Sequence, residues 1–246
     1  MDASASGGGE VTPVTARAHA FVADLDVPAL DDGDEHHLLR VLRLASGSDV
    51  TAGDGAGRWR ACRLTGGPAL EMTGPIVGEP RPAPPITLAF ALVKGERPEL
   101  VVQKLTELGV DRIVPFVAGR SVVRWEPGRA DRHVERWRTI ARQAAMQCRR
   151  MWLPEVAPVA GFDSVAAMPG AALADAAGAP PTLDLPVVLV GPEGGWTVDE
   201  RDSGLPTVAL GAHVLRAETA AITAGAILTA LRAGILDAHQ SGQMVQ

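Results

Sequence analysis

Cysteine is scarce in this 246-residue chain, which contains only Cys62 and Cys148. The two lie far apart, and neither belongs to a cluster of cysteines and histidines. A disulfide framework and a zinc site are therefore not expected, and no other metal site is predicted. Two isolated thiols fit a reducing, cytoplasmic compartment.

Long hydrophobic segments are also missing. The nearest candidate, residues 220–231, is too short to cross a bilayer and contains threonine and glycine. The N-terminal sequence MDASASGGGE lacks the basic and apolar regions of a signal peptide, so residues 1–14 are predicted to form a flexible tail. Because 46% of the residues are hydrophobic, the remainder can bury a core.

Lysine occurs only at positions 94 and 104, so arginine carries most of the positive charge. The net charge of −6 argues against a nucleic-acid partner, but its distribution is uneven. Residues 129–150 contain seven arginines and two acids, a local charge of +5 that leaves −11 for the rest. An Ala/Arg-rich coding composition explains why arginine is used more often than lysine, but it does not explain why the arginines cluster. Arginine suits phosphate forks and base stacking, so the cluster indicates RNA binding.

Several familiar catalytic motifs are absent. The chain has no G-x-x-x-x-G-K-[ST] loop for nucleotide phosphates and no G-x-S-x-G nucleophile elbow. The glycine loop at 191–195 lacks the G-x-G-x-x-G spacing of a dinucleotide site. His36 and His37 are adjacent, and adjacent side chains point apart on a helix, so they do not suggest a metal pair.

The N-terminal part reads as a small, mostly β module. Short strands are expected at 17–24, 49–52 and 58–64, and helical spacing is seen over 34–44. That helix would bury a stripe formed by His37, Val41 and Leu44, with Leu38 and Leu42 adjoining. Glycine-rich turns separate the later segments, as in a barrel-type RNA-binding module.

The strand at 58–64 carries three arginines. A half-buried strand would place Arg58, Arg60 and Arg63 on one face. That face either binds RNA or is simply solvated, and the sequence alone favours neither interpretation.

A proline-rich stretch at 79–85 is stiff and cannot join a sheet interior, so we place the domain boundary there, between domains at 15–78 and 86–240. After it, strands and helices alternate, which predicts an α/β fold with a parallel sheet. Strands are expected at 86–93, 112–117, 185–190 and 207–210, weaker elements over 156–174, and helices at 98–108, 133–148 and 217–236. The helix at 133–148 should bury a stripe of Val134, Trp137, Ile140, Ala141, Ala144 and Cys148.

Two stretches near the C-terminus look like buried strands that run into loops: VLVGPEGGW at 188–196 and LGAHVLRAETA at 210–220. Small residues let a flat ligand approach the backbone closely. Thr197 and Glu200 form a capping box that starts a short helix after the first loop. Two such loops side by side predict a backbone-lined pocket at the carboxyl edge of the sheet.

These stretches and others along the chain match a known family. The chain resembles the ribosomal RNA small subunit methyltransferase E family, within the SPOUT methyltransferases. The matching segments are HHLLRVLRL (36–44), DGAGRW (54–59), QKLTELGVDRIVPF (103–116), Arg120-Ser121, QCRRMWLPEV (147–156), GPEGGW followed by Glu200, and LGAHVLRAETA. The pairing of the last two motifs at this distance is the most specific part.

The resemblance implies a PUA-like N-terminal barrel and a C-terminal SPOUT domain with a deep trefoil knot. It also implies a homodimer, S-adenosylmethionine as methyl donor, and N3 of a uridine in 16S rRNA of the small ribosomal subunit as acceptor. The cofactor positions carried over by the motifs are Leu189, Val190, Gly191, Pro192, Glu193, Gly194, Gly195, Leu210, Gly211, Val214, Leu215, Arg216, Thr219 and Ala220.

Methylation of uracil N3 requires loss of a weakly acidic proton, which an arginine beside the carbonyl oxygens would assist. The candidates are Arg120, Arg150 and Arg216. Glu218 could order Arg216 or act as a base, although an acid in a first helical turn is also explained by the helix dipole. Glu193 could instead only bind backbone amides in its turn.

Contacts with RNA are expected from arginines in both parts of the chain. The candidate RNA-binding residues are Arg40, Arg43, Arg58, Arg60, Arg136, Arg142, Arg149 and Arg150. Two positions depart from the family pattern: His213 replaces a basic residue, and Gly119 replaces an acidic one. Two alternatives remain open, a non-catalytic RNA-binding or ribosome-assembly protein and a knotted methyltransferase that acts on tRNA.

Overall fold

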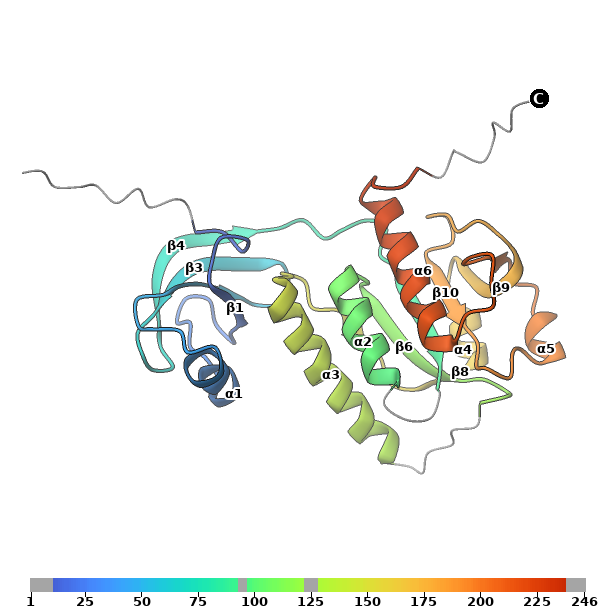
Figure 1. Ribbon diagram of the computed structural model, residues 1–246, viewed down its shortest axis with the longest axis horizontal. Helices are drawn as coiled ribbons and strands as arrows, with labels where there is room; N and C mark the ends of the chain where they lie inside the picture. The colour runs from blue at the N-terminus through green and yellow to red at the C-terminus, as the bar shows by residue number, and fades with distance from the viewer. Residues whose placement is uncertain (1–10, 93–96, 122–127, 238–246) are drawn as a thin grey trace, which may run out of the picture. The chain divides into compact units, whose positions relative to one another are not determined.

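The computed structural model describes residues 11–92, 97–121 and 128–237. The chain divides into two compact units, which are described separately here: Met1–Arg81 with Ala145–Trp152, and Pro82–Ala144 with Leu153–Gln246 (Figure 1). The break after Arg81 lies in the proline-rich stretch. Most of the predicted N-terminal tail, residues 1–10, lies outside the described residues.

The N-terminal unit is built on a four-stranded sheet with the order β1-β2-β3-β4. Its strands are β1 (Ala18–Phe21), β2 (Asp49–Gly53), β3 (Arg58–Leu64) and β4 (Leu70–Gly78). β1 and β2 are parallel, and the other pairs are antiparallel. β4 was not expected, because Gly74 and Pro75 within it argue against a strand. They are tolerated because β4 is an edge strand whose register shifts opposite Arg60–Cys62.

The helix expected at 34–44 lies two to three residues earlier, at Asp32–Val41, and its predicted buried stripe is wrong. A short helix α1 (Asp32–His36) continues as a π-helix, η1 (His37–Val41). Leu38 is buried, but the side chains of Val41 and Leu42 are 58% and 47% exposed. The wider π-helical turn breaks the 3.6-residue spacing on which the predicted stripe depended.

The arginines of β3 make contacts inside their own unit. Arg58 pairs with Asp54 at 2.7 Å, and Arg63 pairs with Asp49 at 3.3 Å. The guanidinium of Arg60 donates to the backbone oxygens of Gly74 and Leu25. Arg60 therefore stabilises the module.

The turn before β3 is held by the carboxylate of Asp54. Burial by itself would raise the pKa of Asp54, but hydrogen bonds from the Arg58 side chain and from the backbone N–H groups of Ala56 and Arg58 outweigh it and lower the pKa. Both cysteines are free thiols. Burial raises the pKa of Cys62 to about 11, so this thiol remains protonated at neutral pH.

The last turn of helix α3 (Arg129–Cys148) and the residues up to Trp152 belong to the N-terminal unit, although they lie far downstream in the sequence. Gly57 has a positive φ of +87°, and a side chain there would meet the Trp152 ring at 2.3 Å. Trp152 donates to the Glu79 carbonyl at 3.2 Å, and Arg81 lies over its ring. The DGAGRW and QCRRMW motifs are thus neighbours in space.

The C-terminal unit contains a seven-stranded sheet in which every pair is parallel, which confirms the predicted α/β class. The order is β11-β9-β10-β5-β6-β7, and β8 also pairs with β6. The strands are β5 (Thr87–Ala91), β6 (Arg112–Val117), β7 (Glu155–Val156), β8 (Ala160–Gly161), β9 (Ala171–Ala179), β10 (Val187–Val190) and β11 (Thr207–Val208).

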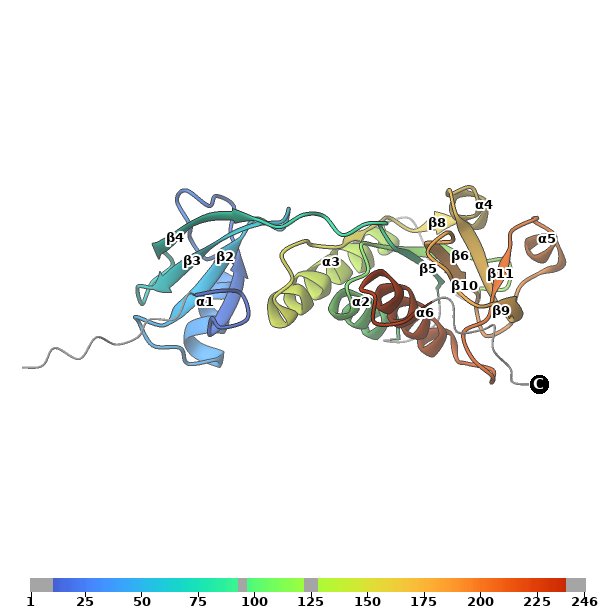
Figure 2. The same ribbon diagram turned by 90° about the horizontal axis from the view of Figure 1, so that it is seen from above.

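Among the described residues, five helices accompany this sheet. They are α2 (Arg97–Leu108), α3 (Arg129–Cys148), α4 (Phe162–Ala166), α5 (Val198–Arg201) and α6 (Ala217–Arg232). Helices α2, α3 and α6 lie on one side of the sheet (Figure 2). Helix α3 begins four residues earlier than expected, and α6 ends before the predicted Leu236.

Alternate residues of β5 face two different cores. Leu88 and Phe90 pack with residues of α2, α3 and α6, whereas Ala89 and Ala91 pack on the other face with Trp196. This double burial explains why the strand reads as a continuous apolar run. The stripe on α3 is buried as expected at most of its positions, but Cys148 is exposed, since the end of α3 leaves this core for the N-terminal unit.

Within the described ranges, no helix is both long and apolar enough to span a membrane. The same residues contain no group of three or more acidic, histidine or cysteine side chains that could hold a metal ion.

A buried ion pair ties α6 to the sheet. Arg232 pairs with the Asp111 carboxylate, and their side chains are only 10% and 4% exposed. Arg232 also donates to the carbonyl of Gly109 at 2.7 Å, while Asp111 accepts the backbone N–H of Ile86 at 2.9 Å. The pair thereby joins the end of α6 to the starts of β5 and β6.

Replacing Arg232 by methionine leaves the Asp111 carboxylate buried without its countercharge. The free energy of unfolding of the C-terminal unit should fall by about 3–5 kcal/mol, measured by denaturant titration. Arg112→Met is the matched control, because the Arg112–Glu155 pair is 42% and 58% exposed and should contribute only about 0–1 kcal/mol. Equal losses in the two variants would contradict this role of the buried pair.

Candidate functional site

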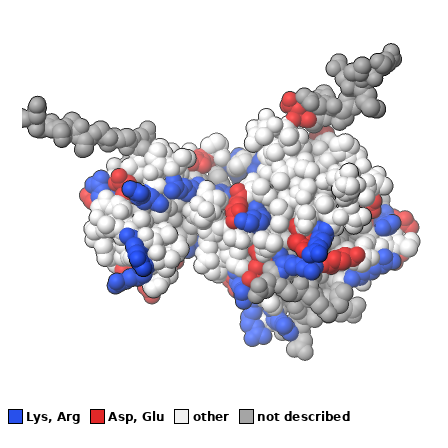
Figure 3. Space-filling model, in the orientation of Figure 1, with Lys and Arg blue, Asp and Glu red and all other residues white. Residues whose placement is uncertain are grey.

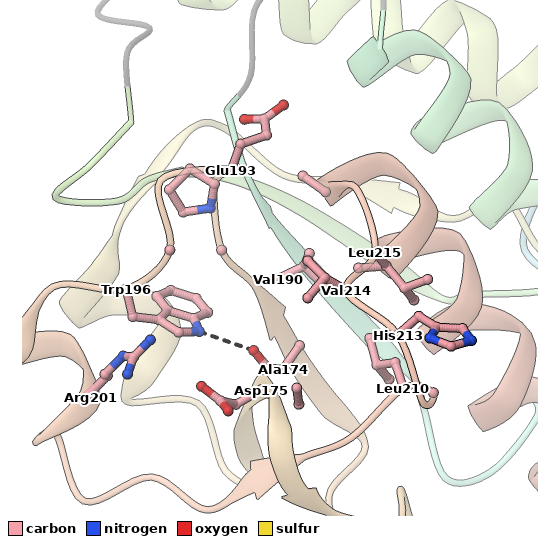
Figure 4. Close-up of a pocket in the computed structure, with 17 residues that line it drawn as sticks. Ala174, Asp175, Val190, Glu193, Trp196, Arg201, Leu210, His213, Val214 and Leu215 are labelled. Carbon is pink, nitrogen blue, oxygen red and sulfur yellow. Dashed lines mark hydrogen bonds between the residues drawn. The ribbon is translucent and has the colours of Figure 1, made fainter.

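The two C-terminal loops line one pocket of about 310 Å³ at the carboxyl end of β10 (Figure 4). One wall is the turn after β10, and the other is the loop that leads into α6. A third wall comes from β9, through Ala174, Asp175 and Ala176. The size lies at the lower end of the range for small-molecule pockets.

Most of the predicted cofactor positions line this pocket. They are Val190, Gly191, Pro192, Glu193, Gly195, Leu210, Gly211, Val214, Leu215 and Ala220. Four other predicted positions do not: Leu189 is buried in the core, and Gly194, Arg216 and Thr219 are exposed.

Other lining residues were not predicted as cofactor positions: Ala174, Asp175, Ala176, Trp196, Arg201, His213 and Ala217. The β9 residues were missed because AALADAAGA has neither alternation nor β-branched residues. His213, which departs from the family pattern, is exposed at the rim.

Trp196 shapes the pocket through its contact with Gly191. Its indole N–H donates to the Ala174 carbonyl at 3.1 Å, so the ring joins the β10 turn to β9. The ring also stacks on the ring of Phe116, with 6.2 Å between the two ring centroids. A side chain at Gly191 would approach the indole at 3.0 Å, so glycine allows the tryptophan to lie against the strand end.

The turn after β10 has its own local support. The N–H of Gly195, which has a φ of +69°, donates to the Pro192 carbonyl at 2.9 Å. Arg120 donates to the Gly194 carbonyl at 2.9 Å. The predicted capping box is present: Thr197 caps α5, and the Glu200 side chain accepts the Thr197 N–H at 2.8 Å.

Gly119 is explained by this capping box. The second carboxylate oxygen of Glu200 accepts the N–H of Gly119 at 2.8 Å, which links the end of β6 to α5. A Cβ at Gly119 would meet the Thr197 methyl group at 2.7 Å. The space beside Gly119 is thus filled by Thr197 and Glu200.

The acids of the two motifs share a basic partner that was not expected. Arg97, at the start of α2, lies 2.6 Å from Glu193 and 3.7 Å from Glu218. The interpretation that Glu193 binds only backbone amides of its turn is therefore wrong. Glu218 is joined to Arg97 instead of Arg216, and its Oε2 atom is buried without a hydrogen-bond partner among the described residues.

The four candidate catalytic residues are divided between the two units. Arg120, Arg216 and Glu218 belong to the C-terminal unit, whereas Arg150 belongs to the N-terminal one. Arg216 is the N-cap residue of α6 and is exposed beside the pocket-lining Leu215 and Ala217.

The candidate RNA-binding arginines differ in how they are held. Arg40 and Arg43 are exposed, and Arg43 has an unusual positive φ of +54°. Arg136 pairs with Glu99 at 2.9 Å, and Arg149 donates to the carbonyls of Pro13 and Val14. Figure 3 shows basic side chains gathered at the N-terminal end of α3, and basic and acidic groups mixed elsewhere on the face shown.

A parallel α/β unit with a glycine-lined pocket, joined to a small β module, is the architecture of a class of RNA methyltransferases. The model of an RNA methyltransferase domain matches residues 79–229, and that of an RNA methyltransferase PUA domain matches residues 30–69. These matches agree with the PUA-like assignment of the N-terminal module.

Individual relatives agree with the domain matches. The chain is 33% identical to the ribosomal RNA small subunit methyltransferase E of Mycobacterium bovis, over 82% of this chain and 86% of that protein. It is 36% identical to that of Synechocystis, over 80% and 70%. The enzyme of that name from Neisseria gonorrhoeae, solved with bound S-adenosylmethionine, superposes with a TM-score of 0.74 at 30% identity, covering 87% of this chain and 97% of that one. The chain belongs to the ribosomal RNA small subunit methyltransferase E family.

Replacing Glu200 by alanine removes acceptors from the N–H groups of Gly119 and Thr197. The free energy of unfolding should fall by about 3 kcal/mol, because two donors lose a charged acceptor. Hydrogen exchange at the Gly119 amide should accelerate. Asp199→Ala in the same helix is the control, since Asp199 is exposed, and an equal effect there would contradict the role of Glu200.

Proposed function

We propose that this protein uses S-adenosylmethionine to methylate N3 of a specific uridine in 16S rRNA of the small ribosomal subunit. The observation that carries the proposal is that the two family motifs line the same pocket. Membership of the family and the cofactor bound to the Neisseria relative support it. The protein would act in the cytoplasm, where small subunits are assembled.

The pocket fits such a cofactor. Gly191, Gly195 and Gly211 keep its walls free of side chains, so a flat adenine ring can reach backbone donors and acceptors. Val190, Leu210, Val214 and Leu215 supply apolar contacts. Leu189, Gly194 and Thr219, which do not line the pocket, would act by shaping the two loops.

S-adenosylmethionine, when bound, supplies an electrophilic methyl group. The chain must therefore orient uracil and assist the loss of its N3 proton. Arg216 is exposed at the pocket rim and would stabilise negative charge on the uracil carbonyl oxygens. Glu218 would order the start of α6 beside Arg216 rather than accept the proton, because it does not line the pocket and its Oε2 atom is buried.

Arg120 and Arg150 would have different tasks. Arg120 supports the turn after β10 through the Gly194 carbonyl, and its exposed side chain stays close to the pocket. Arg150 would bring substrate from the N-terminal unit. We further propose the deep knot and the homodimer that are expected of the family.

RNA binding would come from arginines in both units. Arg40, Arg43 and Arg58 in the N-terminal unit would bind phosphates, together with Arg136, Arg142 and Arg150 of α3 and the loop after it. We leave Arg60 and Arg149 out, because their guanidinium groups already donate to backbone carbonyls.

Small subunits that lack this methyl group provide the test. Incubation with the protein and labelled S-adenosylmethionine should place one methyl group on uridine N3 of 16S rRNA, mapped by nuclease digestion and mass spectrometry. Methylation of bulk tRNA but not of small subunits would instead support the tRNA alternative. Binding of small subunits without any methyl transfer would support a non-catalytic assembly role.

Replacing Gly191 by alanine places a methyl group about 3.0 Å from the Trp196 ring, so this ring, which lines the pocket, must shift. Binding of S-adenosylmethionine, measured by calorimetry, should weaken at least about 10-fold, equivalent to roughly 1.4 kcal/mol. Gly161→Ala is the control, because Gly161 has open space and an ordinary φ of −89°. Unchanged binding in the Gly191 variant would argue against this pocket as the cofactor site.

Arg216→Ala and Arg150→Ala should lose methyl transfer by at least about 100-fold while remaining folded, since the first removes charge stabilisation from uracil and the second removes a cation that would bring the RNA. Turnover on small subunits measures methyl transfer, and circular dichroism checks that each variant is folded. Arg112→Ala is a suitable control, because Arg112 belongs to an exposed ion pair on β6. Arg201→Ala is not suitable, because Arg201 lines the pocket. Normal turnover in both variants would refute the arginine assignments.

A further inference from the structure

Arg97 joins the two motifs that form the pocket. Its Nη1 atom lies 2.6 Å from Oε1 of Glu193, and its Nε atom lies 3.7 Å from Oε1 of Glu218. Glu193 belongs to the turn after β10, and Glu218 belongs to the first turn of α6. Residues from three segments of the chain therefore meet at one guanidinium.

The two acids stand at opposite walls of the pocket. Glu193 is a lining residue, but in Figure 4 its carboxylate points away from the enclosed space. Glu218 itself does not line the pocket, but Ala217 and Ala220 in the same helical turn do. A link between these carboxylates thus sets the separation of the two walls without occupying the ligand space.

The electrostatics favour such a link. Two carboxylates near one guanidinium leave a local charge of −1, and without Arg97 they would repel each other. The Glu218 side chain is only 13% exposed, so its charge is poorly screened by water. Arginine is suited to this position, because its planar fork can bind two acceptors at once.

We propose that Arg97 is a positioning residue that holds the turn after β10 and the start of α6 at the separation required for cofactor binding. The inference rests on the proposed use of S-adenosylmethionine, but it makes a separate statement about the order of the two loops. Arg97 does not line the pocket, so its effect would pass through Glu193 and Glu218.

The first experiment measures cofactor affinity. Arg97→Ala should weaken binding of S-adenosylmethionine about 5- to 20-fold by calorimetry, and KM for the cofactor should rise more than kcat falls. Arg97→Lys should recover part of the affinity, because an ammonium group can pair with one of the two acids but is less able than a guanidinium to bind both. Arg112→Ala is the matched control, since Arg112 is similarly exposed. It pairs with one acid, Glu155, which lies outside the two loops that form the pocket.

A double-mutant cycle separates coupling from a general loss of stability. In a Glu193→Gln background, Arg97→Ala should cost clearly less affinity than in the wild-type protein. Additive losses, or an unchanged affinity in Arg97→Ala, would overturn the proposal.

Hydrogen exchange of the protein without cofactor distinguishes this inference from the proposed function. Arg97→Ala should accelerate exchange both at residues 193–195 and in the first turn of α6, whereas Arg112→Ala should change neither. If the wild-type protein fails to bind S-adenosylmethionine, the proposed function fails, and the exchange result still decides the role of Arg97. Unchanged exchange in both loops would contradict that role.

Discussion

The close contact between the Trp196 ring and the backbone of Gly191 is the constraint on which the pocket depends. The chain leaves β10 through Gly191 and returns within five residues, so the indole covers the strand end from which it started. Its N–H bonds to Ala174 and its stacking on Phe116 fix it against β9 and β6. Because these contacts hold the ring in place, the ring in turn supports the glycine turn.

Charged side chains then connect this turn to its surroundings. Glu200 links it to the end of β6, Arg120 binds its carbonyl oxygen, and Arg97 joins it to the first turn of α6. None of these charges points into the apolar part of the pocket. The polar network thus supports the loops from outside and leaves their backbone groups to a ligand, as expected where binding requires a preformed shape.

The N-terminal unit uses its arginines in a different way. Arg60 and Arg149 bind backbone carbonyls, and Arg58 and Arg63 pair with acids of the same unit. Arg40 and Arg43, in and just after the π-helical segment, are also exposed. A basic cluster in the sequence is therefore a poor guide to which guanidinium groups remain available to RNA.

The sequence by itself determined the fold class, the family and most of the pocket lining. Buried parallel strands must be apolar on both faces, and glycine turns next to them need particular residues, so both leave local patterns at β5 and in the 191–195 loop. The tertiary structure alone decided which distant residues meet. Asp175 on β9 and Arg97 on α2 carry no local signal, because their positions follow from strand order and helix packing. Likewise the π-helix at 37–41 disturbed a regular spacing, and only three-dimensional contacts could show that Gly119 makes room for Thr197 and Glu200.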